Sequence, residues 1–282
     1  MDWNKTKTIF IVVFSILNIF LYSLYLKQHT ETQNVQTIGK TSIEELMKQE
    51  NITYNLPQAV KNDFSYISAN IKMFSKEELE SLVSQSIIIV DNTQIESTMN
   101  KPISIQNSKG DYHFIDFLTK YVWNGTEYEL WEVDKKNQSA MFFQQVDGEP
   151  IFYSTNAMLI IHWNEEHEVT KYEQRMLKDF TSFNKKKDLM TQDEAVSSLV
   201  TRGYVKQDSK ILRVIPGYST RVQLTTETQV FAPTWNIRVE LKDGSIEEHF
   251  INAIEGKVID FQFEKMEEDN PDEELDDDEV DE

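Results

Sequence analysis

The chain of 282 residues carries a net charge of −20 at pH 7 and contains no cysteine. Without cysteine it can form neither a disulfide framework nor a thiolate metal site. The acidic balance argues against nucleic acid as a partner, because the one basic cluster, residues 185–187, is too short to neutralise a row of phosphates.

The first predicted element is a transmembrane helix over residues 9–26, an uncharged run of 18 residues between Lys7 and Lys27. A helix of this length measures about 27 Å, close to the hydrocarbon thickness of a bilayer. Bulky residues follow the run, whereas a signal-peptide cleavage site has small ones, so we expect a retained anchor. The lysines that precede it place residues 1–8 in the cytoplasm and predict a single-pass protein of the cell membrane with most of its chain outside.

A polar stripe runs along this predicted span. Ser15, Asn18 and Tyr22, followed by Tyr25, are spaced so that they share one side of a helix. An amide near the bilayer centre is costly unless it finds a partner, and Ser and Asn can hydrogen-bond across a helix pair. We therefore predict that Ser15, Asn18 and Tyr22 contact another transmembrane helix. The alternative is that Ser15 bonds to its own helix and the tyrosines lie in the interfacial aromatic belt.

The rest of the chain divides into a stalk, a folded part and a tail. Residues 27–40 are polar and are interpreted as a stalk between membrane and folded part. The folded part is long enough for two small units, which we predict over residues 41–186 and 187–263. Residues 264–282 contain 13 acidic residues and one lysine, a composition that predicts a disordered tail.

Three predicted helices begin with a Ser/Thr-x-x-Glu signature, in which the two side chains cap each other's backbone donors. They are expected over residues 42–50, 75–85 and 191–202, with the capping pairs Ser42 and Glu45, Ser75 and Glu78, and Thr191 and Glu194. Val83 is expected to point inward in the second of them. A fourth helix is predicted over residues 168–183, where Tyr172, Met176 and Phe180 recur at helical spacing.

Strand signals dominate the remainder, with runs of β-branched and aromatic residues separated by turn formers. The predicted strands are residues 114–123, 128–133, 140–146, 151–163, 213–215, 221–224, 234–241, 247–253 and 257–263. Asp243-Gly244 gives the strongest hairpin signal. Strands joined by tight turns form antiparallel sheets, so the predicted fold class is α+β.

A weak internal similarity predicts how these elements are grouped. Residues 157–174 and 247–262 both read as a strand, an acidic turn and a close in which Val is followed three residues later by Tyr or Phe and then by Gln, two residues after Tyr172 and one residue after Phe261. We therefore expect one N-terminal transmembrane helix followed by an extracytoplasmic domain of two related units, each an antiparallel sheet with short helices. The alternative is a chance resemblance between two amphipathic hairpins.

The sequence contains no convincing site of catalysis. His162 and His167 bracket two glutamates, but they are five residues apart, whereas the zinc-peptidase helix needs its histidines four apart. His113 and Asp116 could form a base pair for a nucleophile, yet no serine stands in a nucleophile elbow and no glycine-rich phosphate loop occurs. We interpret these as turn and surface residues and predict no catalytic, cofactor-binding or metal-binding residue, no cofactor and no enzyme activity.

The N-terminal sequence carries a resemblance to a known family. It reads MDWNKTKTIFIVVFSILNIFLYSLYLKQ, and the MDWxKTKTIFI start followed by a span with asparagine near its middle is the specific part. This segment resembles the N-terminus of the YycI (WalI) family of two-component system regulatory proteins of low-GC Gram-positive bacteria. The acidic tail is not a feature of that family's core.

The resemblance implies a regulatory function. It implies a non-enzymatic, membrane-anchored accessory protein of the essential cell-wall sensor histidine kinase YycG (WalK), which acts with the sister protein YycH through transmembrane helix and ectodomain contacts. The lipid bilayer, the kinase and YycH are thus the expected partners. Two alternatives are an extracytoplasmic module that captures a peptide or cell-wall fragment, and an anchored chaperone or inhibitor whose acidic tail binds a basic client.

Overall fold

The computed structural model describes residues 3–34, 40–54, 64–107, 109–183, 189–220 and 228–261. The predicted α+β class is confirmed within them, since short helices accompany an extensive, mostly antiparallel sheet. The predicted strand 221–224, the basic cluster 185–187 and the acidic tail 264–282 lie outside the described residues.

In the described residues the helices are few and, apart from the first, short. They are α1 (Trp3–Asn34), α2 (Lys40–Gln49), α3 (Lys76–Leu79), α4 (Ile115–Tyr121) and α5 (Gln192–Thr201), with one 3₁₀ turn, η1 (Gly125–Glu127). The strands are β1 (Thr53–Tyr54), β2 (Tyr66–Ile71), β3 (Gln85–Val90), β4 (Gln94–Ser104), β5 (Tyr128–Asp134), β6 (Ser139–Val146), β7 (Glu149–Phe152), β8 (Met158–Trp163), β9 (Glu168–Arg175), β10 (Leu177–Phe183), β11 (Lys210–Ser219), β12 (Thr228–Glu240), β13 (Ile246–Asn252) and β14 (Val258–Ile259).

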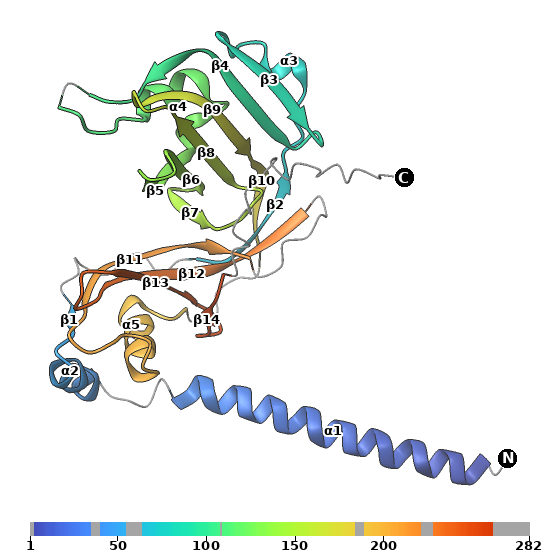
Figure 1. The fold of residues 1–282 in the computed structure, drawn as a ribbon. Coiled ribbons are helices and arrows are strands. Elements are labelled where there is room, and N and C mark those ends of the chain that lie inside the picture. The colour runs from blue at the N-terminus through green and yellow to red at the C-terminus, as the bar shows by residue number, and fades with distance from the viewer. Residues whose placement is uncertain are drawn as a thin grey trace, which may run out of the picture.

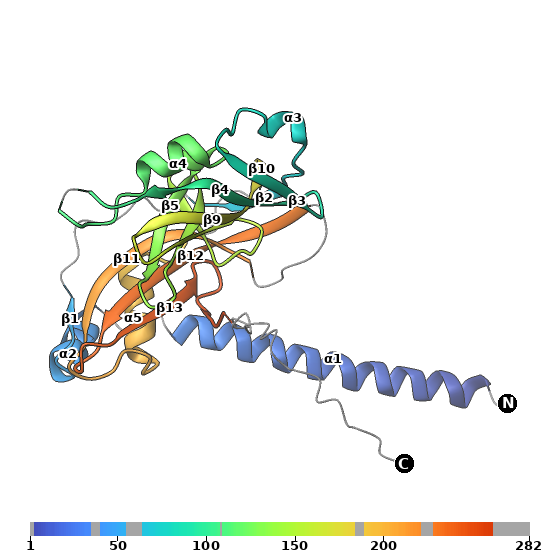
Figure 2. The same cartoon turned by 45° about the horizontal axis from the view of Figure 1, so that its top comes forward.

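All of these strands belong to one hydrogen-bonded network in the order β10-β2-β12-β11-β7-β6-β8-β9-β4-β3, with β1, β5, β13 and β14 attached at its sides. The network is folded into two lobes (Figure 1). The first lobe consists of β3–β6, β8 and β9 with α3 and α4. In the second lobe the sheet of β11, β12 and β13 lies between the first lobe and helices α2 and α5. The long strand β12 runs out of the second lobe beside β2 (Figure 2).

The core of the first lobe forms where α4 packs on the sheet. Phe117, Leu118 and Tyr121 are buried on one side of α4, against Phe142 and Tyr172 of the strands. The predicted strand over residues 114–123 is therefore wrong. Its aromatic composition is typical of strands, but its apolar residues also recur at the three- and four-residue spacing of a helix.

The predicted helix over residues 168–183 is also wrong, because this segment forms β9 and β10. Its apolar residues are four apart, a spacing that suits a helix and also keeps residues on one face of a strand. The predicted helix over residues 75–85 is too long. It ends at Leu79, Val83 is 64% exposed, and the β-branched run that follows forms β3.

The core of the second lobe lies between its sheet and the two helices α2 and α5. Trp235, Ile237 and Val239 alternate along β12 and pack with Met47 of α2 and Leu199 of α5. The β12–β13 hairpin predicted at Asp243-Gly244 is confirmed. Gly244 has a φ of +83°, which glycine adopts without strain.

Two of the three predicted capping pairs are confirmed. Ser75 caps α3 and Thr191 caps α5, each in a reciprocal box with the glutamate three residues later. Ser42 lies within α2, which begins two residues before the predicted start, at Lys40.

The capping box of α5 leads to a measurable prediction. Thr191→Ala removes the hydroxyl that accepts from the Glu194 N–H at 3.3 Å, and we expect it to lower the free energy of unfolding by about 1 kcal/mol. Urea unfolding of the full chain in detergent measures this loss. Glu194→Gln is the matched control, since glutamine also completes a capping box. Equal unfolding midpoints for wild type and Thr191→Ala would show that the cap contributes nothing.

The arrangement as two related units is not confirmed, and the core does not divide at residue 187. The N-terminal elements α2 and β1 belong to the second lobe, where β1 pairs in parallel with β11 and Ile43 and Met47 join the core. Strand β2 pairs with both β10 and β12, and β7 pairs with β11. Segments from both predicted units are therefore interleaved in one sheet network.

Candidate functional site

Helix α1 lies outside the two lobes (Figures 1 and 2). Its apolar window Lys7–Leu24 contains 18 residues, of which none is buried, and in the described part of the chain it is the one helix long and apolar enough to cross a membrane. The helix continues to Asn34, so its C-terminal end takes up much of the segment predicted as a stalk. An apolar helix whose window is not buried against any other described residue fits a single-pass membrane protein.

The predicted contact residues Ser15, Asn18 and Tyr22 are all exposed on α1. The Asn18 Nδ2 donates a hydrogen bond to the Phe14 carbonyl oxygen at 3.0 Å. This bond within the helix lowers the cost of placing the amide in hydrocarbon. No donor from the described residues reaches Asn18 Oδ1, which is therefore available to a neighbouring helix.

The folded part contains an open cleft of about 350 Å³ between β10 and the turn that holds η1. Apolar and charged side chains line it together: Lys72, Trp123, Asn124, Glu127, Met176, Leu177, Lys178, Asp179 and Phe180. The sequence does not predict this cleft, because its walls come from segments about 50 to 100 residues apart that the sheet brings together.

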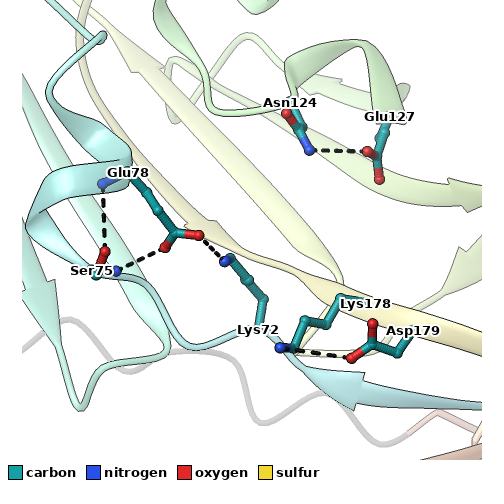
Figure 3. Close-up of polar contacts among 7 residues, drawn as sticks. All are labelled: Lys72, Ser75, Glu78, Asn124, Glu127, Lys178 and Asp179. Carbon is teal, nitrogen blue, oxygen red and sulfur yellow. Dashed lines mark hydrogen bonds and ion pairs between the residues drawn. The ribbon is translucent and has the colours of Figure 1, made fainter.

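Each lysine of the cleft is paired with a carboxylate, and Glu127 accepts a hydrogen bond from Asn124 (Figure 3). Lys72 forms an ion pair with Glu78, and its hydrogen bond holds the pKa of Glu78 below the ordinary value. Lys178 Nζ lies 3.7 Å from Asp179 Oδ2. On the opposite wall, Asn124 Nδ2 donates to Glu127 Oε1 at 3.2 Å. The lysines of the cleft are thus balanced by neighbouring carboxylates.

The amide of Gln144, a fully buried side chain on β6, contacts two of the residues that line the cleft, Leu177 and Glu127. Its Oε1 accepts from the Leu177 N–H at 2.8 Å, and its Nε2 donates to the Leu177 carbonyl at 2.9 Å. Nε2 also lies 3.2 Å from Glu127 Oε2. The amide therefore occupies the place that a neighbouring strand would take beside β10. Period-two alternation with Ala140 and Phe142 could have indicated that Gln144 points inward.

The histidines considered as metal or base candidates lie apart from the cleft. His162 is on β8, with Nε2 3.9 Å from Glu173 Oε1, and burial lowers its pKa. His167 is in the following turn, where its Nδ1 lies 3.0 Å from the Tyr112 hydroxyl. In residues 3–261, apart from the ranges left undescribed, no group of three or more His, Asp and Glu is arranged to hold a metal ion.

His113 and Asp116 form a contact of 3.7 Å between Nδ1 and Oδ2 at an exposed position near the start of α4. An exposed pair of this kind contributes little binding energy, because water screens it. His113 and Asp116 are surface residues and His167 is a turn residue, as predicted, whereas the prediction is wrong for His162, which is half-buried on β8.

Comparison with known proteins gives one family. The sequence profile described as "YycI protein" matches residues 30–254. No curated protein matches the chain. Among solved structures, an uncharacterized protein from Eubacterium rectale is similar at 10% identity and a TM-score of 0.43, over 75% of this chain and 89% of that one. That score is too low to support any argument about function. The profile match spans both lobes and most of the sequence, and the chain therefore belongs to the YycI protein family.

Proposed function

We propose that this protein is a membrane-anchored, non-enzymatic regulator of a cell-wall sensor histidine kinase of the YycG (WalK) type. It acts together with the sister protein YycH, with its N-terminus in the cytoplasm and its two lobes outside the cell. The observation that carries the proposal is the family match across both lobes, joined to an apolar helix that buries none of its window. YycI family membership fits a regulatory accessory protein.

The proposed mechanism is a shift between two states of the kinase. A partner can bias two helix arrangements only if it binds one of them better than the other. Helix α1 would bind one arrangement of the kinase helices more tightly than the other within the bilayer. The lobes would pair with YycH and set the position of α1 relative to the kinase. A coupling free energy of about 1–3 kcal/mol changes kinase output about 5- to 150-fold when output follows the bound population.

The stripe on α1 is the proposed contact with the kinase helices. Asn18 contributes its Oδ1 as an acceptor, and Ser15 and Tyr22 lie on the same side one turn away in each direction. A hydrogen bond between transmembrane helices contributes about 0.6–2 kcal/mol.

Asn18→Leu tests this contact. The substitution removes the amide and preserves an apolar, helix-forming span, so we expect about 3- to 30-fold weaker association with the kinase, the range that corresponds to one such hydrogen bond. Co-purification from membranes with matched protein levels, followed by transcription of the kinase's target genes, measures the effect. Ile16→Leu, a neighbouring change off the stripe, is the control. Unchanged co-purification and transcription would remove Asn18 from the mechanism.

A further inference from the structure

Strand β10 is an edge strand, which in the described part of the chain pairs with β2 alone. The Lys72 N–H donates to the Met176 carbonyl at 2.8 Å, so these two residues form a hydrogen-bonded pair at the start of the ladder. Alternation along the ladder then turns the backbone groups of Leu177 away from β2, toward the Gln144 amide.

The same alternation exposes a second backbone position on this edge. A bulge separates Lys178 from Thr181, and Asp179 within it has a φ of +56°. After the bulge the register resumes with Thr181 opposite Ser68, which turns the N–H and C=O of Ser182 away from β2. Gln144 thus occupies the position of a pairing strand beside Leu177, whereas none of the described residues pairs with the outward side of Ser182.

The cleft described above lies along this edge. Trp123, Met176 and Phe180 supply its apolar lining, and its volume of about 350 Å³ is at the small end of ligand pockets. Its lysines are already paired, Lys72 with Glu78 and Lys178 with Asp179, so the cleft does not attract an anion. The chemistry that complements it is an uncharged chain with backbone donors and acceptors and an apolar side chain.

We propose that an extended, uncharged segment of a partner polypeptide adds as a strand to the outer edge of β10 at residues 179–183 and places an apolar side chain in the cleft. Edge strands bind peptides in this way, the backbone giving affinity and the pocket giving specificity. Lys178 and the bulge limit indiscriminate pairing of the edge, as in other exposed edge strands. The segment is assigned to the ectodomain of YycH, and this assignment rests on the proposed function.

Ser182→Pro tests the proposal with Ser182→Ala as the matched control. Proline removes the outward N–H and is tolerated on an edge strand, whereas alanine keeps the N–H and changes only the side chain. We expect at least about a tenfold loss of YycH association for Ser182→Pro and none for Ser182→Ala, consistent with a lost hydrogen bond and a blocked edge. Full-length proteins co-expressed with YycH and the kinase are purified from membranes, and the amount of each partner is measured.

Hydrogen exchange of the wild-type chain provides a second measurement that does not depend on the variant folding. Bound YycH should slow exchange of the amides at residues 179–183. If Ser182→Pro associates with YycH as well as the wild type does, or if bound YycH does not slow exchange at these amides, the edge proposal is overturned. Neither result contradicts regulation of the kinase through α1. If exchange at these amides slows in the absence of YycH as the concentration of this chain rises, a second copy of the chain is the occupant. That result also overturns the edge proposal. Failure of the wild-type chain to associate with YycH overturns both proposals.

Discussion

Gln144→Leu is expected to lower the free energy of unfolding by about 2–5 kcal/mol, because each buried backbone group left unpaired costs about 1–3 kcal/mol. Gln144 is fully buried, and Leu177, whose N–H and C=O it satisfies, is 1% exposed. Leucine has a similar volume and leaves both backbone groups without a partner. Urea unfolding of the full chain in detergent measures the loss.

The neighbouring Gln145 is the control for this variant. Its Nε2 donates to Glu129 Oε2 at a solvent-exposed site, so Gln145→Leu should change the unfolding free energy by no more than about 0.5 kcal/mol. Hydrogen exchange should localise the effect of Gln144→Leu to β10 and the turn with Glu127. A similar shift for both variants would mean that the Gln144 amide does not support the edge of β10.

Replacing residues 9–26 by an unrelated apolar helix of equal length is expected to abolish regulation of the kinase while the chain stays in the membrane. A uniform leucine span inserts as well, but it offers no polar group to the kinase helices. Loss of a coupling of about 1–3 kcal/mol corresponds to about a 5- to 150-fold change in target transcription. The lobes should unfold at an unchanged temperature, since no residue of the α1 window is buried against them.

A rescue variant makes this test specific. The same leucine span with serine, asparagine and tyrosine restored at positions 15, 18 and 22 should recover a large part of the regulation. Recovery separates the stripe from general effects of the span on insertion. Full regulation by the plain leucine span would show that the helix is only an anchor and that the lobes carry the coupling.

Patterns within a few residues of one another predicted several elements correctly. The uncharged run predicts α1, Asp243-Gly244 predicts the β12–β13 hairpin, and the signatures at Ser75 and Thr191 predict caps. These features depend on helix length, on turn geometry and on hydrogen bonds between near neighbours, all of which are encoded locally. The same reasoning failed at 114–123 and 168–183, where the spacing of apolar residues suits both a helix and a strand.

The cleft and the strand network depend on contacts that no local pattern contains. Asn70 of β2 meets Thr228 of β12, which is 158 residues away in the chain, and Gln144 meets Leu177, which is 33 residues away. β10 becomes an edge strand, and Gln144 pairs with its Leu177, only when the whole sheet has assembled. The sequence by itself therefore determines the anchor and its polar stripe. The ectodomain surface depends on long-range strand pairing, because the packing of the whole sheet decides which strands pair.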